Sequence, residues 1–180
     1  MTNDKRGGID ESREKISLGI AILTVSDTRT EETDSSGRIL RERAEEAGHR
    51  IVGKLIVTDD ADVIEAQLRA WIANEAVDVI LATGGTGITG RDVTPEAFFA
   101  VYDKEIPGFG ELFRRISEDS IGLSAIQSRA TAGVAGATLL FALPGSNGAC
   151  RDAWDRILVH QLDSRYRPCN FAELLPRLAE

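Results

Sequence analysis

A short glycine-rich segment is the part of this chain best suited to binding an anion. Thr83-Gly84-Gly85-Thr86-Gly87 directly follows an apolar run that predicts a buried strand. Glycine permits sharp turns in which successive backbone N–H groups converge on one anion, and threonine adds hydroxyl donors. The segment lacks the lysine of a Walker A loop and the dinucleotide-binding glycine pattern. We therefore predict a phosphate cradle at Gly84, Gly85, Thr86 and Gly87, with an ordinary flexible turn as the alternative.

Two aspartates are placed to bring negative charge to the same region. Asp59 follows a second predicted strand, 51–57, and Asp92 lies in the segment 91–95, RDVTP, just beyond the glycine loop. Two carboxylates beside a phosphate cradle can hold Mg²⁺ between themselves and the phosphate. Each acid also has a purely structural explanation, because Asp59 or Asp60 can cap the next helix and an acid suits any helix start.

Weaker candidates follow other predicted strands or stand beside a cation. Ser26 comes directly after the first strand, where it is either a phosphate contact or a helix-capping residue. Gly145 and Ser146 lie in LPGSN, between a strand and a helix, where backbone N–H groups can hold a second anion. Ser128 precedes Arg129, which supplies a positive charge in an acidic chain unless it simply forms a surface ion pair.

The order of the predicted elements brings these loops to one edge of a sheet. Apolar runs at 18–25, 51–57 and 77–82 alternate with helical patterns at 37–47 and from 61 onward. This alternation predicts an α/β fold with a mostly parallel sheet and helices on both faces. Ligands of such sheets bind beyond the carboxyl ends of the strands, where all of these loops lie.

The second half of the chain has a less regular pattern. Thr94 is the predicted N-cap of a helix with proline at its first position, and apolar residues at 109–116 indicate another helix. A strand at 138–143 precedes a helix that begins near 147. Apolar residues at 171–178 predict a short last helix.

Composition and charge restrict the class of protein. The chain has 180 residues, 42% of them hydrophobic and 28% charged, which is typical of one globular domain. We predict a flexible N-terminal arm at 1–15 and a single domain at 16–180. The formal net charge of −8 argues against nucleic-acid or membrane partners, which need a basic surface. The N-terminus lacks the apolar core of a signal peptide, so we expect a cytoplasmic protein.

Six motifs resemble, in the same order, those of the molybdopterin-binding MoaB/MogA family. They are TVSDTR at 24–29, DSSG at 34–37, TGGTG at 83–87, RDVTPEA at 91–97, PGFGE at 107–111 and LPGS at 143–146. The resemblance covers nearly the whole chain from about residue 17, and it implies a three-layer α/β sandwich. The C-terminal part is similar to MoaB members, which implies a homo-oligomer, either a trimer or a hexamer built from trimers.

The resemblance also implies a reaction. MogA-type members are molybdopterin adenylyltransferases, which use Mg²⁺ and transfer AMP from ATP to the terminal phosphate of molybdopterin. Their essential acids correspond to Asp59 and Asp92, which would be both catalytic and metal-binding here. The TGGTG loop corresponds to the contact with the pterin phosphate, and Ser146 is a further candidate contact.

Two other functions stay open at this point. Some MoaB members bind the pterin without adenylylating it, and these depart from RDVTPEA. This chain keeps Arg91, Asp92 and Thr94, which favours the active form, but has Thr58 where active members often have proline. A non-catalytic molybdopterin-binding carrier is therefore the main alternative, and a generic nucleotide-binding regulator is a more distant one.

Overall fold

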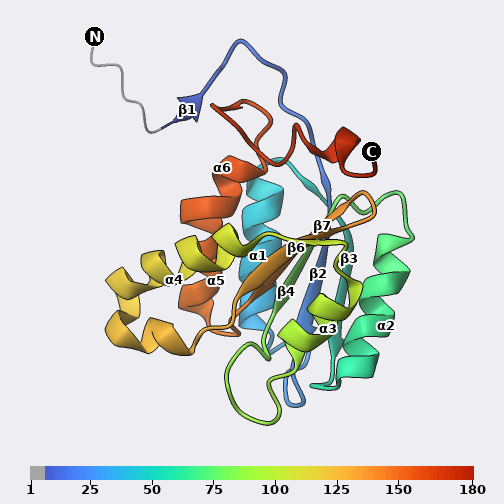
Figure 1. Ribbon diagram of the computed structural model, residues 1–180, viewed down its shortest axis with the longest axis vertical. Coiled ribbons are helices and arrows are strands. Elements are labelled where there is room, and N and C mark those ends of the chain that lie inside the picture. The colour runs from blue at the N-terminus through green and yellow to red at the C-terminus, as the bar shows by residue number, and fades with distance from the viewer. Residues whose placement is uncertain (1–6) are drawn as a thin grey trace.

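A six-stranded sheet forms the centre of the molecule (Figure 1), and the computed structural model describes residues 7–180. The strand order is β3-β2-β4-β7-β6-β5, and the first four strands are parallel to one another. The strands are β2 (Gly19–Val25), β3 (Arg50–Val57), β4 (Val79–Thr83), β5 (Lys104–Glu105), β6 (Thr131–Ala135) and β7 (Thr138–Leu143). The last two strands of this order are antiparallel to their neighbours: β6 pairs antiparallel with β7, and β5 pairs antiparallel with β6. The predicted mostly parallel sheet is confirmed.

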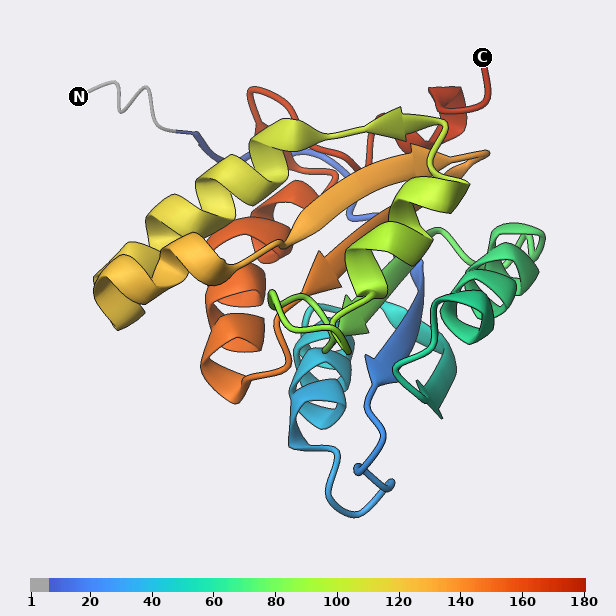
Figure 2. The ribbon, with the colours of Figure 1, turned by 60° about the horizontal axis from the view of Figure 1, so that its bottom comes forward.

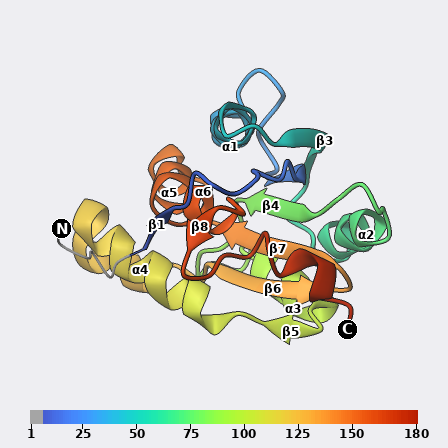
Figure 3. The ribbon, with the colours of Figure 1, turned by 90° about the horizontal axis from the view of Figure 1, so that it is seen from above.

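Helices cover both faces of this sheet, which confirms the predicted three layers (Figure 3). One face carries α1 (Ser35–Glu46), α4 (Pro107–Ile121) and α5 (Asn147–Ala153). The other face carries α2 (Ala61–Ile72) and α3 (Thr94–Val101). After α5 the chain continues through one π-helical turn, Trp154–Leu158, into α6 (Val159–Gln161). Among residues 7–180, no helix is long and apolar enough to span a bilayer.

The central strands are apolar on both sides because each side faces a helical layer. Ile22, Leu81 and Phe141 stand in one row across β2, β4 and β7, and all three belong to the core beneath α1, α4 and α5. Ile80 and Leu140, one position earlier in the register, belong to the core beneath α2 and α3. A one-residue shift of register would exchange the two sets, so the packing of both layers fixes the register.

The DSSG motif has a structural role at the start of α1. Asp34 is fully buried, caps the helix by accepting the Gly37 N–H at 2.9 Å, and pairs with Lys54 at 2.9 Å. Burial alone acts to raise the pKa of Asp34, but Lys54 and the hydrogen bonds from Gly37 and Thr24 lower it below its usual value. Asp34 therefore stays ionised and ties α1 to β3.

Helix α2 separates the roles of the two neighbouring aspartates that precede it. Asp60 is the N-cap, and its Oδ1 accepts the N–H groups of Asp62 and Val63 at 3.0 and 3.2 Å. Asp59 is therefore not used as a cap. The helical pattern from residue 61 onward predicts one apolar face that includes both Val63 and Ile64. Ile64 is buried, but Val63 is 43% exposed, so the prediction was wrong for Val63.

Two other local predictions differ from the structure. The N-cap of α3 is Val93, not Thr94, because the Thr94 hydroxyl donates to a carbonyl in the glycine loop instead of capping its own helix. The predicted last helix is only the 3₁₀ turn Leu175–Arg177. Pro176 lies in this turn and has no N–H to donate, which limits helical pairing.

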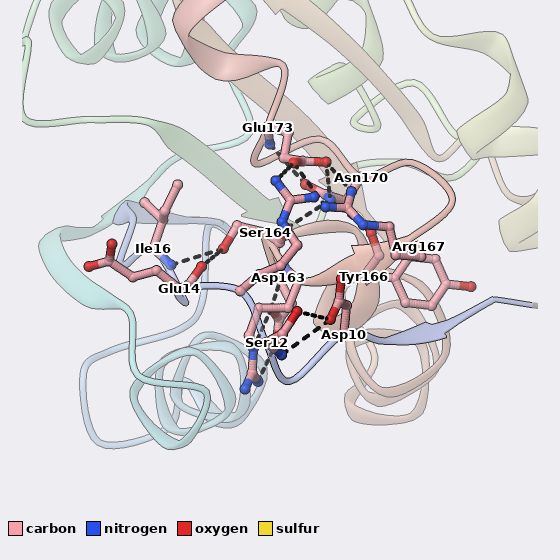
Figure 4. Close-up of polar contacts among 12 residues, drawn as sticks. Asp10, Ser12, Glu14, Ile16, Asp163, Ser164, Tyr166, Arg167, Asn170 and Glu173 are labelled. Carbon is pink, nitrogen blue, oxygen red and sulfur yellow. Dashed lines mark hydrogen bonds and ion pairs between the residues drawn. The ribbon is translucent and has the colours of Figure 1, made fainter.

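The described part of the predicted arm, residues 7–15, lies along the C-terminal segment (Figure 4). Strand β1 (Gly8–Ile9) pairs antiparallel with β8 (Tyr166–Arg167). Ser164 accepts the Ile16 N–H at 3.0 Å and donates to the Glu14 carbonyl at 2.9 Å. The sequence did not predict this pairing, and residues 1–6 lie outside the described part of the chain.

Asn170 holds the C-terminal side of this contact. It is 2% exposed, and its amide donates to the carbonyls of Ser164 and Tyr166 and to Glu173 Oε2 at 3.3, 2.9 and 3.0 Å. Its Oδ1 accepts the Glu173 N–H at 2.8 Å. One buried side chain therefore contacts four polar groups of the segment that the arm packs against, with the two hydrogens of its amide shared among three acceptors.

We expect Asn170→Ala to lower the free energy of unfolding by about 2–3 kcal/mol, because it leaves buried carbonyls without a donor. Urea unfolding at neutral pH measures this change. Asn74→Ala is the matched control, since Asn74 is exposed and accepts a single local N–H bond from Ala76. An equal loss of stability in both variants would contradict the role given to Asn170.

Candidate active site

The glycine loop lies where the ends of three strands meet. Figure 2 brings this end of the sheet forward and shows the loops that follow β2 and β4. Gly84 and Gly85 have φ angles of +109° and +64°, which side-chain-bearing residues rarely adopt. A Cβ on Gly84 would overlap the Val25 carbonyl at the end of β2. The Gly84 N–H donates to the Leu143 carbonyl at the end of β7 at 3.0 Å. The loop is therefore seated directly on the sheet.

Thr94 fixes the first half of the loop from the start of α3. Its buried hydroxyl donates to the Gly84 carbonyl at 2.8 Å, and its N–H donates to the Gly85 carbonyl at 3.0 Å. Arg129 fixes the second half, where its N–H reaches the Thr86 carbonyl at 3.0 Å and its Nε reaches the Gly87 carbonyl at 2.6 Å.

All four loop carbonyls are therefore turned toward the protein. Within residues 7–180, the N–H groups of Gly85 and Thr86 donate to no backbone carbonyl. A loop whose carbonyls are occupied and whose N–H groups are available is suited to an anion, because only positive dipole ends remain to face it.

Asp59 is held beside the loop by Asp27, which follows β2. The Asp27 N–H donates to Asp59 Oδ2 at 3.0 Å, and the Asp59 N–H donates to Asp27 Oδ1 at 3.1 Å. Arg91 pairs with the other oxygen of Asp27. A Cβ on Gly85 would lie only 3.1 Å from Asp59 Oδ1, which shows how closely this carboxylate approaches the loop.

Asp92 approaches the other side of the same loop. Its Oδ2 accepts the Thr89 hydroxyl at 2.6 Å and the Thr89 N–H at 2.8 Å. A Cβ on Gly87 would lie 2.7 Å from that oxygen. The Thr89 hydroxyl bond is the main reason that the pKa of Asp92 lies below its usual value, so this carboxylate is ionised.

The charges around Asp59 favour a cation. Partial burial and then the negative charge of Asp27 raise the pKa of Asp59 above its usual value, and Asp92 adds to the effect. A bound cation would relieve this repulsion, since it stabilises the ionised form. No group of three or more His, Cys, Asp or Glu side chains suited to a metal occurs in residues 7–180. Mg²⁺ needs only one or two carboxylates when water and phosphate oxygens complete its shell, so Asp59 and Asp92 fit that ion.

A cavity of about 240 Å³ opens next to the second half of the loop. Thr86, Gly87, Ser128 and Ser146, all singled out in the sequence, line it together. Gly145 does not line the cavity but packs against the glycine loop, since a Cβ on Gly145 would be 3.2 Å from the Gly84 Cα. The predicted loops after β4 and β7 and the segment before β6 therefore meet at one cavity.

Ser26 lies apart from this cavity. Its hydroxyl accepts the N–H groups of Thr28 and Arg29, both at 3.2 Å, in the turn that carries Asp27. The contact with a ligand predicted for Ser26 stays a prediction, while its described bonds shape the turn.

Three residues that build the site were not predicted from the sequence in the roles that they have in the structure. Asp27 follows β2 and Asp59 follows β3, and these two strands are neighbours in the sheet. The strand order could therefore have predicted that the two aspartates lie close together. Arg129 was noted only as a cation, whereas its Nη2 also donates to the Asp92 carbonyl at 2.6 Å. Asp152, on α5, lines the cavity, and no sequence pattern pointed to it.

We expect Gly85→Ala to lower the free energy of unfolding by about 1–3 kcal/mol, because alanine disfavours this backbone conformation and its Cβ would overlap Thr94 Oγ1. Gly90→Ala is the control, since a Cβ there meets nothing within 4 Å and it should change stability by less than about 0.5 kcal/mol. Urea titrations of both variants test this difference, and a neutral Gly85→Ala would refute the tight seating of the loop.

Known proteins with the same features identify the family. Residues 21–164 match the family described as a probable molybdopterin binding domain. Molybdenum cofactor biosynthesis protein B of Escherichia coli (strain K12) is 56% identical over 160 residues, which are 89% of this chain and 94% of that protein. The protein of the same name from Bacillus cereus is 52% identical over 142 residues, or 78% of this chain and 84% of that protein.

Solved structures agree with the sequence comparison. A crystal structure of molybdenum cofactor biosynthesis protein B matches with a TM-score of 0.84 and 44% identity, covering 92% of this chain and 98% of that one. A MogA structure matches with a TM-score of 0.69 and 34% identity, covering 89% and 97%. The resemblance found in the sequence motifs is confirmed, and the chain belongs to the MoaB/MogA family of molybdenum cofactor biosynthesis proteins.

Proposed function

We propose that this protein binds molybdopterin and, with Mg²⁺ and ATP, transfers AMP to its terminal phosphate. The observation that carries the proposal is the position of Asp59 and Asp92, whose carboxylates lie against Gly85 and Gly87 of one anion-binding loop. Membership of a family described by molybdopterin binding supports the choice of substrate. A loop for phosphate, two acids for a cation and a cavity for a ring are three of the parts that this reaction needs.

The glycine loop holds the terminal phosphate of the pterin in this proposal. The N–H groups of Gly85 and Thr86 and the Thr86 hydroxyl donate to phosphate oxygens, while Thr94 and Arg129 keep the loop carbonyls turned away. This arrangement binds an anion in a chain of net charge −8 without using a lysine. The ring of the pterin lies in the adjoining cavity.

Asp59 and Asp92 would hold the metal ion beside the glycine loop, and the ion would help to orient ATP there. Mg²⁺ bound there would neutralise charge that develops on the ATP phosphates. An oxygen of the pterin phosphate forms a bond to the α-phosphorus of ATP, and the bond from that phosphorus to the oxygen bridging to the β-phosphate breaks. Pyrophosphate leaves with the electron pair of the broken bond, and the protein contributes positioning and electrostatic stabilisation.

A molybdopterin-binding carrier without catalysis is the second candidate. Relatives named molybdenum cofactor biosynthesis protein B and the threonine at position 58 favour it. Thr58, however, is exposed, and the position of Asp59 is set by its paired bonds with Asp27. The side chain at position 58 is therefore not needed to hold the acid, which supports the enzyme.

We expect Asp92→Asn and Asp59→Asn each to reduce pyrophosphate release from ATP, Mg²⁺ and molybdopterin by about a hundredfold or more, because the neutral amide holds a cation poorly. Binding of molybdopterin should survive in both variants. Asp62→Asn is the control, since Asp62 is exposed on α2. Wild-type protein that binds molybdopterin but releases no pyrophosphate would favour the carrier instead.

We further propose that the protein forms a homo-oligomer, a trimer or a hexamer. Leu123 and Ile126 are 86% and 84% exposed, and Ile126 lines a groove of about 420 Å³ together with Phe99, which is 51% exposed. Neighbouring exposed apolar side chains of this size are typical of a protein interface.

The double variant Leu123→Glu/Ile126→Glu should shift the protein toward monomers, because burying two carboxylates in an apolar interface is unfavourable. Light scattering coupled to gel filtration measures the mass. Leu174→Glu is the control, because Leu174 is also exposed but lies near the C-terminus, outside this groove. A monomeric wild-type protein would exclude the proposed assembly.

A further inference from the structure

One ionisable side chain lines the cavity beside the glycine loop. Among its described lining residues, serines, Thr86 and Gln127 supply neutral polar groups, Phe113 and Ile121 supply apolar surface, and Asp152 alone carries a charge. Ser120 donates to Asp152 Oδ2 at 2.9 Å, and within residues 7–180 no cation pairs with this carboxylate. A carboxylate without a paired cation is unexpected in a cavity that is proposed to bind a phosphorylated ligand, because the carboxylate repels phosphate.

The position of Asp152 separates it from the phosphate end of the cavity. Ser146 caps α5 beside the glycine loop, and Asp152 follows six residues later on the same helix. Six residues of helix span about 9 Å along the axis. The cavity therefore has a neutral, donor-rich end at Thr86, Gly87 and Ser146, and an anionic end at Asp152.

This polarity matches a ring that carries a phosphate on one side and a pair of N–H donors on the other. The pyrimidine ring of a 2-amino-4-oxo pterin presents N3–H and the 2-amino group side by side, and a carboxylate accepts two such parallel bonds. We propose that Asp152 is the subsite that recognises this N–H edge, with Ser120 positioning its carboxylate. The proposal rests on the proposed binding of molybdopterin and names the group that selects its ring.

The same chemistry assigns the cavity to the pterin and not to adenine. The corresponding edge of adenine presents one donor, the 6-amino group, beside an acceptor nitrogen. A carboxylate facing that edge would gain one bond and repel the lone pair next to it, so the cavity discriminates against adenine. ATP must then approach the glycine loop from the side of Asp59.

Fluorescence titration with 6-hydroxymethylpterin phosphate tests the subsite, because this probe carries both the N–H edge and a phosphate. We expect Asp152→Asn and Asp152→Ala to weaken its binding about tenfold or more, since two hydrogen bonds to a charged acceptor are lost. The N3-methyl analogue lacks N3–H, so wild-type protein should prefer the unmethylated 4-oxo probe and Asp152→Ala should lose that preference. Competition by inorganic phosphate should be unchanged in both variants.

Asp155→Asn is the matched control, because Asp155 follows on the same helical stretch but pairs with Arg43 of α1 and lies outside the cavity lining. Ser120→Ala should weaken probe binding less than Asp152→Ala does. Unchanged affinity of Asp152→Asn for the 4-oxo probe would overturn the subsite while leaving the proposed function intact. Wild-type protein that binds no pterin phosphate would overturn both, and equal weakening of the probe and of inorganic phosphate would mean that Asp152 only maintains the fold.

Discussion

The site depends on a close backbone approach at Gly84, where the chain leaves β4. The carbonyl of Val25, at the end of β2, leaves no room for a side chain on Gly84. Gly145, in the loop after β7, packs against the Cα of Gly84. Three strand ends therefore meet with backbone directly against backbone. A loop seated in this way has little freedom, so its N–H groups are oriented before a ligand arrives, and binding does not have to order them.

The acidic side chains around this loop have two roles: Asp27 positions Asp59, and Asp59 and Asp92 bring negative charge to the loop. Arg91 pairs with Asp27 and neutralises part of its charge. Asp27 in turn holds Asp59 through two hydrogen bonds, each from the backbone N–H of one aspartate to the carboxylate of the other. Asp92 is kept ionised by Thr89, while the pKa of Asp59 is raised by burial and by its acidic neighbours. The negative charges of Asp27, Asp59 and Asp92 thus lie beside the loop, where they would attract a divalent ion.

Much of the architecture could be predicted because it follows from local periodicity. Apolar runs fixed β2, β3, β4 and β7, and the alternation with helices fixed the parallel order and the edge at which the loops gather. Thr94 shows the limit of such patterns. A local pattern predicts that its hydroxyl caps its own helix, but in the folded protein the hydroxyl donates to the Gly84 carbonyl of the glycine loop. The pairing of β1 with β8 joins segments far apart in the chain, which no local pattern reveals.

The candidate site was predictable to the same extent. Residues that follow strands, such as Asp59 and Ser146, could be expected at one edge, because parallel strands end together. Asp152 lies in the middle of a helical stretch, where an aspartate is usually only a solvated side chain. Its place in the cavity depends on how α4 and α5 pack on each other, and that packing follows from the volumes of many side chains at once.

The C-terminus leaves the fold at the end of the sheet opposite to the loops after β2 and β4 (Figure 1). Glu180 is exposed there, beyond the short turn Leu175–Arg177. A tether joined to this last residue would leave the glycine loop and its cavity open to solution. The protein can therefore be immobilised on a sensor surface, or fused to a reporter domain, through its C-terminus without obstructing the approach of small ligands.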